Sequence, residues 1–312
     1  PPHEHLVETR TCKHCQTPFP ITDKDMEFYA KVSPKFWEKT YMIPPPTLCP
    51  DCRRRRRMAW RNVWNLYRRT CDATGKKILA FYDESVKHPI YEVEFWNSDW
   101  WNPLVYGREF NFQRSFFEQF WELKDVVPHF SRSILRSENS EYSNNASDLK
   151  NCYLCFNGNN TEDSYYVRLT NDVKNSLDCY SIDWSEYCYE CIDIKSCTTV
   201  FYSKDCELCN NSYFLRSCTN CKNCFFCKNL HSKEFYIKNM PHTKDQYELE
   251  VKRLLSSYSY RELQHQFQEW QVSLPEKDSH MLRTENVSGD YITNSKNISY
   301  SFDITDCENL KY

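Results

Sequence analysis

The chain has 312 residues, which is enough for two or three domains with cores of their own. Its formal net charge of −3, from 40 Lys and Arg against 43 Asp and Glu, excludes a polycation, so any nucleic-acid surface must be local. Aromatic residues make up 16% of the chain and glycine occurs only 4 times, which excludes a disordered composition.

The 18 cysteines raise the question of the redox compartment. Dense disulfide frameworks belong to small secreted domains. The first ten residues lack the apolar segment of a signal peptide, and no apolar run long enough to span a membrane occurs. We therefore expect a reduced, cytoplasmic protein without membrane contact, in which Cys-x-x-Cys marks metal ligands or buried thiols.

Two Cys-x-x-Cys pairs, Cys12 with Cys15 and Cys49 with Cys52, lie near the start of the chain. A two-residue gap lets one tight turn direct both thiolates at one ion, and zinc takes four such ligands in a tetrahedron. The pattern predicts a structural Zn²⁺ held by these four cysteines. The alternative is four reduced cysteines in a core. His14 lies between two ligands and could replace one of them or face solvent.

The residues around these pairs form a longer pattern. They are Cys12, Cys15, Phe19, Ile21, Asp25, Phe28, Tyr29, Lys31, Pro44 to Pro46, and Cys49-Pro-x-Cys52-Arg. This stretch resembles the "probable zinc-ribbon" family, whose pattern is a Cys pair, an E/D-x-x-F-Y segment and a C-P-x-C-R-x-x-R close. The resemblance implies a treble-clef or ribbon-like zinc module and no particular activity. The whole chain also resembles zinc-ribbon, Cys-rich-repeat proteins of candidate-phylum bacteria, which implies no function either.

An arginine-rich segment follows, with eight arginines and no acidic residue between positions 53 and 69. In a helix, Arg53, Arg57, Arg61 and Arg68 would share one stripe with Trp64. Guanidinium groups beside an aromatic ring suit phosphate contact and base stacking. The predicted nucleic-acid surface comprises Arg53, Arg54, Arg57, Arg61, Trp64, Arg68 and Arg69. The alternatives are arginines that face the protein's own acids or a protein partner, and contact with anionic lipid.

Residues 71 to 136 predict a small aromatic-rich α+β segment. Ser115 begins a capping box, and the aromatic residues that follow it predict a well-buried helix. Lone Cys71 is interpreted as a structural thiol rather than a nucleophile activated by neighbouring arginines. Trp100 and Trp101 could instead form a platform for a base or another ligand.

Similar segments recur from residue 138 onward and predict a β-solenoid. Lys150, Lys174, Lys195 and Arg216 begin them, at spacings of 24, 21 and 21 residues. Coils of that length would stack at ~4.8 Å. Because Cys exchanges with Ser and Val at equivalent positions, the pattern predicts thiols that face inward. The two predicted interior columns are Cys152, Ser176, Cys197, Cys218 and Cys155, Cys179, Val200, Cys221.

Four cysteines in this region, each three residues after the last, approach the spacing of an iron–sulfur ligand run. They are Cys218, Cys221, Cys224 and Cys227. The last gap is shorter than in such runs and no proline follows, so the alternative to a second metal site is four buried thiols.

Residues 241 to 275 predict a helical hairpin inserted between coils. Thr243 and Ser259 each begin a capping box. The expected role of the hairpin is to cover the apolar edge of the interrupted stack, and the alternative is to present a partner surface. The repeat pattern returns between residues 276 and 312. Because the sequence stops within a repeat, we expect the natural protein to be longer.

The sequence thus predicts a mixed, mainly β protein. Its segments are 1–70, a treble-clef or zinc-ribbon unit with an Arg-rich helix; 71–136, the aromatic α+β segment; 137–240, the β-solenoid; 241–275, the hairpin; and 276–312, resumed coils. No phosphate-binding glycine loop and no recognisable pairing of nucleophile and base occurs. We expect a non-enzymatic adaptor that binds nucleic acid, structured RNA rather than DNA, or a larger ribonucleoprotein.

Two other functions stay open at this point. The first is a protein–protein interaction scaffold that uses the solenoid and the helical insertion. The second is an enzyme, either one that acts on polysaccharides through a column of acids or a metal-redox protein. The acids of such a column would be Glu162, Glu186 and Glu207.

Overall fold

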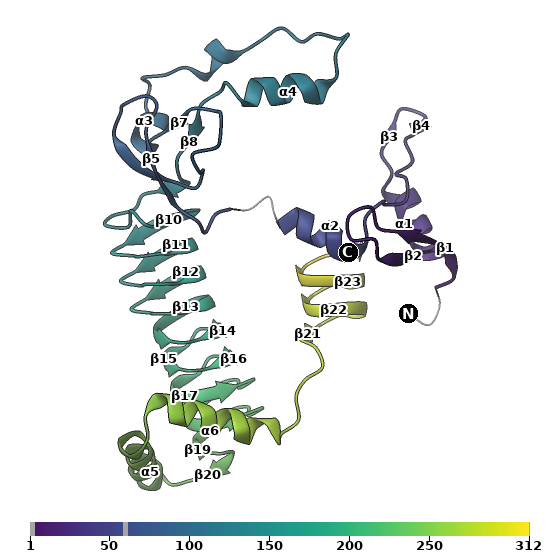
Figure 1. The fold of residues 1–312 in the computed structure, drawn as a ribbon. Helices are drawn as coiled ribbons and strands as arrows, with labels where there is room; N and C mark the ends of the chain where they lie inside the picture. Colours follow the sequence, from purple (N-terminus) through teal and green to yellow (C-terminus); the bar gives the residue numbers. More distant parts are fainter. Residues whose placement is uncertain (1–3, 59–61, 312) are drawn as a thin grey trace. The chain divides into compact units, whose positions relative to one another are not determined.

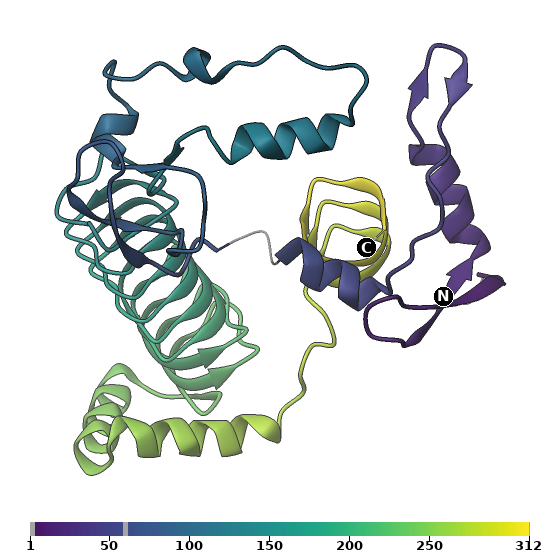
Figure 2. The ribbon, with the colours of Figure 1, turned by 45° about the horizontal axis from the view of Figure 1, so that its top comes forward.

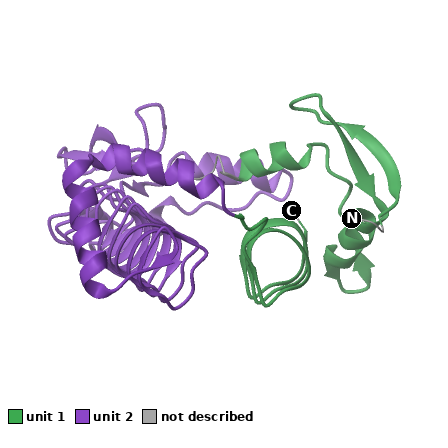
Figure 3. Cartoon of the chain, turned by 90° about the horizontal axis from the view of Figure 1, so that it is seen from below, with its two compact units in different colours: residues 1–61, 275–312 green, residues 62–274 purple. Residues whose placement is uncertain are grey.

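The computed structural model describes residues 4–58 and 62–311 and is mainly β. It separates into two compact units, unit 1 with residues 1–61 and 275–312, and unit 2 with residues 62–274 (Figure 3). In the described residues no helix is long and apolar enough to cross a membrane.

The N-terminal part of unit 1 is a hairpin followed by two helices (Figure 1). Its elements are β1 (Leu6–Thr11), β2 (Pro18–Thr22), α1 (Asp23–Val32), β3 (Lys35–Phe36), β4 (Lys39–Thr40) and α2 (Pro50–Met58). Strands β1 and β2 pair antiparallel, and the turn between them carries the first cysteine pair. Helix α1 begins directly after β2 because Thr22 and Asp25 form a capping box.

In the C-terminal part of unit 1, the chain winds so that successive strands pair in parallel, and we call such a winding a coil. Its strands are β21 (Met281–Leu282), β22 (Glu285–Thr293), β23 (Lys296–Thr305) and β24 (Glu308–Lys311). The register between β22 and β23 shifts between Val287 and Gly289. Gly289 has a φ of +141°, and a Cβ there would lie 1.7 Å from the carbonyl oxygen of Ser301, so the coil needs glycine at this shift.

Unit 2 begins with an aromatic-rich cap. Its elements are β5 (Tyr67–Thr70), β6 (Lys77–Ala80), β7 (Ile90–Tyr91), α3 (Val93–Trp96), the 3₁₀ helix η1 (Pro103–Tyr106), α4 (Phe116–Lys124) and β8 (His129–Phe130). Strands β5 and β6 form an antiparallel hairpin, and β7 pairs with β8 in parallel.

Helix α4 corrects the prediction of a well-buried helix. Its aromatic side chains are between 44% and 68% exposed, and no residue of the helix is buried. Ser115 is the N-cap, but its side chain makes no capping hydrogen bond. Aromatic content indicates a surface that favours burial, but it does not establish that a partner element lies against it.

The cap leads into a long parallel coil (Figure 2). Its strands are β9 (Ile134–Leu135), β10 (Ala146–Lys150), β11 (Phe156–Glu162), β12 (Arg168–Lys174), β13 (Tyr180–Tyr189), β14 (Ile192–Lys195), β15 (Thr198–Phe201), β16 (Lys204–Glu207), β17 (Asn210–Arg216), β18 (Lys222–Lys228) and β19 (Glu234–Ile237). Throughout, a residue pairs with the residue twelve positions later, as in Asn159 with Asn171 and Thr198 with Asn210.

One complete turn of this coil therefore takes twelve residues, and the predicted length of 21 to 24 residues is wrong. Every third residue from Asn145 to Lys238 has a positive φ, so each turn has four sides of three residues. Asn and Asp hold many of these corners, because they tolerate the left-handed conformation. From Ala146 to Cys227, the residue after each corner is buried in the interior of the coil.

Inward residues are small or aliphatic, and many are cysteines. Buried side chains such as Cys188, Cys191, Ile194 and Cys197 follow one another every three residues. The thiols face inward as predicted, and their Sγ atoms donate to backbone carbonyls, for example Cys191 to Val200 O at 3.1 Å. The Cys-x-x-Cys spacing here arises because each side of the coil is three residues long. Residues share a column only when they are a multiple of twelve positions apart. The two predicted columns are therefore wrong: Cys152 and Ser176 share a column, but Cys197 lies in another.

The predicted column of acids is corrected in the same way. Glu162 lies between Lys150 and Lys174, with Nζ to carboxylate distances of 3.2 and 3.1 Å. Glu186 is in register with Lys174, but Glu207 is in register with Lys195 on another side of the coil. A spacing of 21 residues is one and three-quarter turns, and it moves a side chain to a neighbouring side.

One outward column of the coil is aromatic or aliphatic throughout, and we call it the aromatic column. Its members pair in parallel, each with the next: Tyr153, Tyr165, Leu177, Tyr189, Phe201, Tyr213, Phe225 and Ile237.

After β20 (Met240–Pro241) the chain forms α5 (Lys244–Ser257) and α6 (Tyr260–Val272). The capping boxes at Thr243 and Ser259 are both present, as predicted. Val251, Leu263 and Phe267 pack in one buried cluster with Phe225 and Ile237. The two helices therefore cover the end of the aromatic column, which confirms the expected covering role.

Candidate metal centre

The first ligand pair lies in the turn between β1 and β2. Cys12 N donates to Thr17 O at 3.0 Å, and Gln16 N donates to Cys12 O at 3.0 Å. Gln16 takes a φ of +61°, which closes the turn tightly after Cys15. Both thiol-bearing residues are thus held in a rigid loop of the hairpin.

The second pair lies at the start of α2. Pro50 is the first helical residue, where its fixed φ and missing N–H fit the helix start. Arg53 N donates to Cys49 O at 3.0 Å, so Cys52 is in the first helical turn. A hydrogen bond from Lys13 N to Thr47 O, 3.0 Å, joins the two ligand-bearing segments.

The four sulfur atoms converge on one position. The Sγ atoms of Cys12, Cys15, Cys49 and Cys52 all lie within 4.8 Å of one another. The Sγ atoms of Cys15 and Cys49 are 3.6 Å apart. A tetrahedral zinc thiolate with bonds of ~2.3 Å places its sulfurs about 3.8 Å apart, so the spacing suits this ion. Cys12, Cys49 and Cys52 are buried and Cys15 is exposed, which leaves the centre closed on most sides.

The surroundings favour thiolate at one ligand and oppose it at another. Burial acts to raise the pKa of Cys12, but hydrogen bonds from the backbone of Cys15, Cys49 and His14 lower it to about 6. Burial and the neighbouring thiols raise the pKa of Cys52 to about 12. Four close thiolates need a cation between them, and a divalent metal supplies it.

Two side chains outside the ligand set contact Cys52. His14 Nδ1 lies 3.4 Å from its Sγ, and Arg55 Nη2 donates to the same atom at 3.6 Å. Zinc with four thiolates carries a net charge of −2, so a guanidinium donor stabilises it. Arg55 was missed as a neighbour of the centre, although its position one helical turn after Cys52 is a usable signal.

These observations define a zinc-binding domain with four cysteine ligands in which zinc is structural. Residues 8–60 match a family model described as "Probable treble clef domain". None of the curated proteins compared with the chain is similar enough to count as a relative.

The predicted nucleic-acid residues do not form one helical stripe. Helix α2 ends at Met58, and Arg61 lies outside the described residues. Trp64 follows in an irregular segment, and Arg68 and Arg69 lie on β5 in unit 2. The prediction of a helix up to residue 69 is wrong because Tyr67–Thr70 pairs with Lys77–Ala80, a cross-strand contact that helical periodicity cannot detect.

Four of the five arginines of α2 face solvent, and the fifth, Arg53, is half-buried with its Nη1 3.5 Å from Tyr29 Oη. Arg54, Arg55, Arg56 and Arg57 are exposed. Arg54 lies over the ring of Phe302, with its Cζ 5.2 Å from the ring centroid. In unit 2, Arg168 lies 4.8 Å from the ring centroid of Trp64, so that ring is partly engaged within the protein.

The four-cysteine run in the coil occupies successive sides of one turn. Cys218, Cys221, Cys224 and Cys227 are all fully buried. Their Sγ atoms donate to the carbonyls of residues two positions earlier, at 3.4 to 3.5 Å. A second metal here stays a prediction.

Proposed function

We propose that the zinc domain presents α2 to a nucleic acid, and that the protein is a non-enzymatic adaptor for which structured RNA is favoured over DNA. The observation that carries the proposal is the run Arg54 to Arg57. All four side chains are exposed, and across residues 4–58 and 62–311 none of them makes an ion pair with a carboxylate. Exposed guanidinium groups without a carboxylate partner suit phosphate oxygens.

Helical geometry divides these arginines by role. At about 100° per residue, Arg54 and Arg57 lie ~60° apart around the helix, so both can meet one phosphate backbone. Arg55 points to the other side, where it contacts Cys52. Contacts with phosphates carry no base sequence, so recognition of RNA shape fits this arrangement better than reading of a DNA sequence.

We further propose that β9–β19 and β21–β24 are β-solenoid segments, and that the cytoplasm is the location. The twelve-residue offset of β9–β19 and the offset of eleven to twelve residues in β21–β24 support the first, and 18 cysteines without a disulfide support the second.

The test is binding of a hairpin RNA, compared with duplex DNA of equal length, as salt is varied. With about two phosphate contacts the log–log slope is expected at roughly −1.5 to −2. The double variant Arg54→Gln/Arg57→Gln should bind more weakly and with a shallower slope. The matched control, Lys252→Gln/Arg261→Gln on α5 and α6, removes the same charge and should bind as the wild type does. Equal binding by both variants would remove the proposal.

A second candidate function, a protein-interaction scaffold, is favoured by the aromatic column. Helices α5 and α6 cover the column near Phe225 and Ile237. Tyr153, Tyr165 and Leu177 on the same column are 37% to 47% exposed. Nuclease treatment of a pull-down separates the two candidates, because it releases partners held through nucleic acid and leaves partners that dock on the protein.

A further inference from the structure

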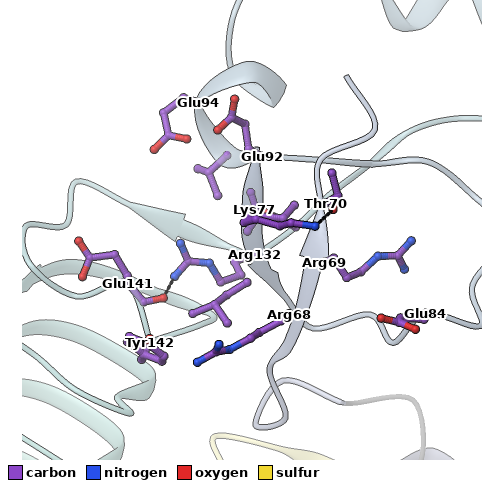
Figure 4. Close-up of a pocket in the computed structure, with 14 residues that line it drawn as sticks. Arg68, Arg69, Thr70, Lys77, Glu84, Glu92, Glu94, Arg132, Glu141 and Tyr142 are labelled. Carbon is purple, nitrogen blue, oxygen red and sulfur yellow. Dashed lines mark hydrogen bonds between the residues drawn. The ribbon is translucent and has the colours of Figure 1, made fainter. Parts of the chain in front are cut away.

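A further candidate site lies within unit 2. It is a pocket of about 910 Å³ beside the β5–β6 hairpin and the residues that lead into the coil (Figure 4). Arg68, Arg69, Lys77 and Arg132 line it, together with the ring of Tyr142 and aliphatic side chains of β6. A volume of this order holds a small organic ligand.

Arg132 is the fixed cation of this pocket. Its Nη1 donates to the backbone oxygens of Glu141 and Ser143, the latter at 3.3 Å, so the guanidinium group is held in place. Its Nε is buried and meets no acceptor in the described parts of the chain. Burial lowers the pKa of Arg132, although Glu94 and Glu141 act in the opposite direction. A buried charged donor without an acceptor is costly, so the protein leaves the hydrogen-bonding capacity of this guanidinium group partly unsatisfied.

Arg68 is the second cation available to a ligand. It is exposed and, among the residues that the structure describes, has no carboxylate partner. Figure 4 shows its side chain and that of Arg132 directed to the side of the pocket where Tyr142 lies. The other two cations are engaged: Arg69 Nη1 donates to Asp83 O at 2.5 Å, and Lys77 Nζ to Thr70 Oγ1 at 2.8 Å.

Among the described residues, no acid of the pocket forms an ion pair with Arg68 or Arg132. Glu92 is buried and pairs with Lys76 at 3.1 Å. Glu141 meets Arg132 through its backbone oxygen, while Figure 4 shows its carboxylate directed away. Glu84 and Glu94 are exposed side chains. Two guanidinium groups therefore remain beside an aromatic ring.

We propose that this pocket binds a nucleotide, with its phosphate between Arg68 and Arg132 and its base against the ring of Tyr142. Guanidinium N–H groups match phosphate oxygens in pairs, and an aromatic ring stacks on any base. The nucleotide is either free or the phosphorylated end of a nucleic acid. The site goes beyond the role of α2, because no residue of α2 takes part.

The experiment titrates the full chain with adenosine 5′-monophosphate, adenosine, ribose 5-phosphate and inorganic phosphate. The monophosphate should bind at least about tenfold more tightly than each of the other three, because only it offers both phosphate and base. A 5′-phosphorylated oligonucleotide, compared with its 5′-hydroxyl form, distinguishes the two sources. Tighter binding of the phosphorylated end than of the free nucleotide assigns the end of a nucleic acid, and the reverse assigns a free nucleotide.

Variants separate the site from the fold and from α2. Arg68→Gln and Tyr142→Ala should each weaken binding of the monophosphate at least about tenfold. Tyr142→Phe keeps the ring and should bind as the wild type does, and Arg54→Gln/Arg57→Gln should leave the affinity unchanged. Melting curves of Arg68→Gln and Tyr142→Ala should match the wild type. No binding of the monophosphate, equal binding of inorganic phosphate, or full binding by Arg68→Gln would overturn the proposal.

Discussion

Single side chains hold unit 1 together at two points. Lys311 Nζ lies 2.7 Å from Asp25 Oδ1, with the two side chains 6% and 2% exposed, and so ties the last coil strand to the start of α1. Asp25 also caps α1 through its other carboxylate oxygen. Near the zinc centre, Arg55 plays a comparable role by donating to a ligand sulfur. In both contacts a positively charged side chain lies against a group that is negatively charged when ionised.

Replacing Arg55 with Gln should weaken zinc binding. The guanidinium group offsets part of the negative charge of the tetrathiolate, and loss of such an outer neighbour typically costs ~10- to 100-fold in metal affinity. Competition with a chromophoric chelator measures it. Arg56→Gln, an exposed arginine on the same helix, is the matched control and should retain wild-type affinity. An equal loss in both variants would show that the effect is general helix charge.

The Asp25–Lys311 pair should make stability depend on pH. Burial acts to raise the pKa of Asp25, but hydrogen bonds from Lys311 and Thr22 outweigh it and hold this pKa below its ordinary value. A lowered folded-state pKa means that the stabilisation is fully present above the unfolded-state pKa of ~3.9 and is lost as the pH falls through the folded value.

Asp25→Asn should therefore unfold more readily than the wild type at neutral pH, by about 3 kcal/mol for a broken buried pair. The difference between the two proteins should shrink as the pH falls below ~4. Denaturant titrations across this range measure it. A difference that stays constant with pH would contradict the assignment.

At the scale of elements, the coil and the helical hairpin depend on each other. The aromatic column places Phe225 and Ile237 outward, where the end of the coil would otherwise expose them, and Leu263 and Phe267 of α6 cover them. In contrast, α4 carries aromatic residues of the same kind with no buried position. Burial of an aromatic side chain thus depends on the element that faces it.

Phe267→Ala should destabilise unit 2 by ~3–5 kcal/mol, because it leaves a cavity among buried rings. Phe117→Ala removes the same side chain from α4, where it is 68% exposed, and should change stability by less than about 0.5 kcal/mol. Thermal or chemical denaturation compares the two. Similar losses in both variants would mean that α4 is packed in solution.

The sequence predicted the features that depend on local chemistry. Cys12 and Cys52 could be assigned to zinc because each lies in a short ligand turn, and Ser259 could be assigned as an N-cap because its partner is three residues away. Features set by distant pairing were missed. Arg68 belongs to a hairpin, and the turn length of the coil follows from pairs such as Asn159 with Asn171.

As a whole molecule, the protein combines an arginine-rich helix that begins at the zinc centre in one unit with the pocket of Arg68 and Arg132 and a covered coil in the other. Helix α2 begins at the zinc centre, because Cys49 directly precedes its first residue and Cys52 lies in its first turn. Without the ion, no bond holds the four cysteine side chains together. The zinc domain has a small hydrophobic core, so it is expected to unfold when zinc is removed.

Metal content of the purified full chain tests this central claim most directly. Elemental analysis should find one zinc per chain in the wild type and close to none in Cys49→Ser, with no iron in either. Two or more zinc ions per chain would place metal also at Cys218 to Cys227, and a wild-type protein without zinc would contradict the account.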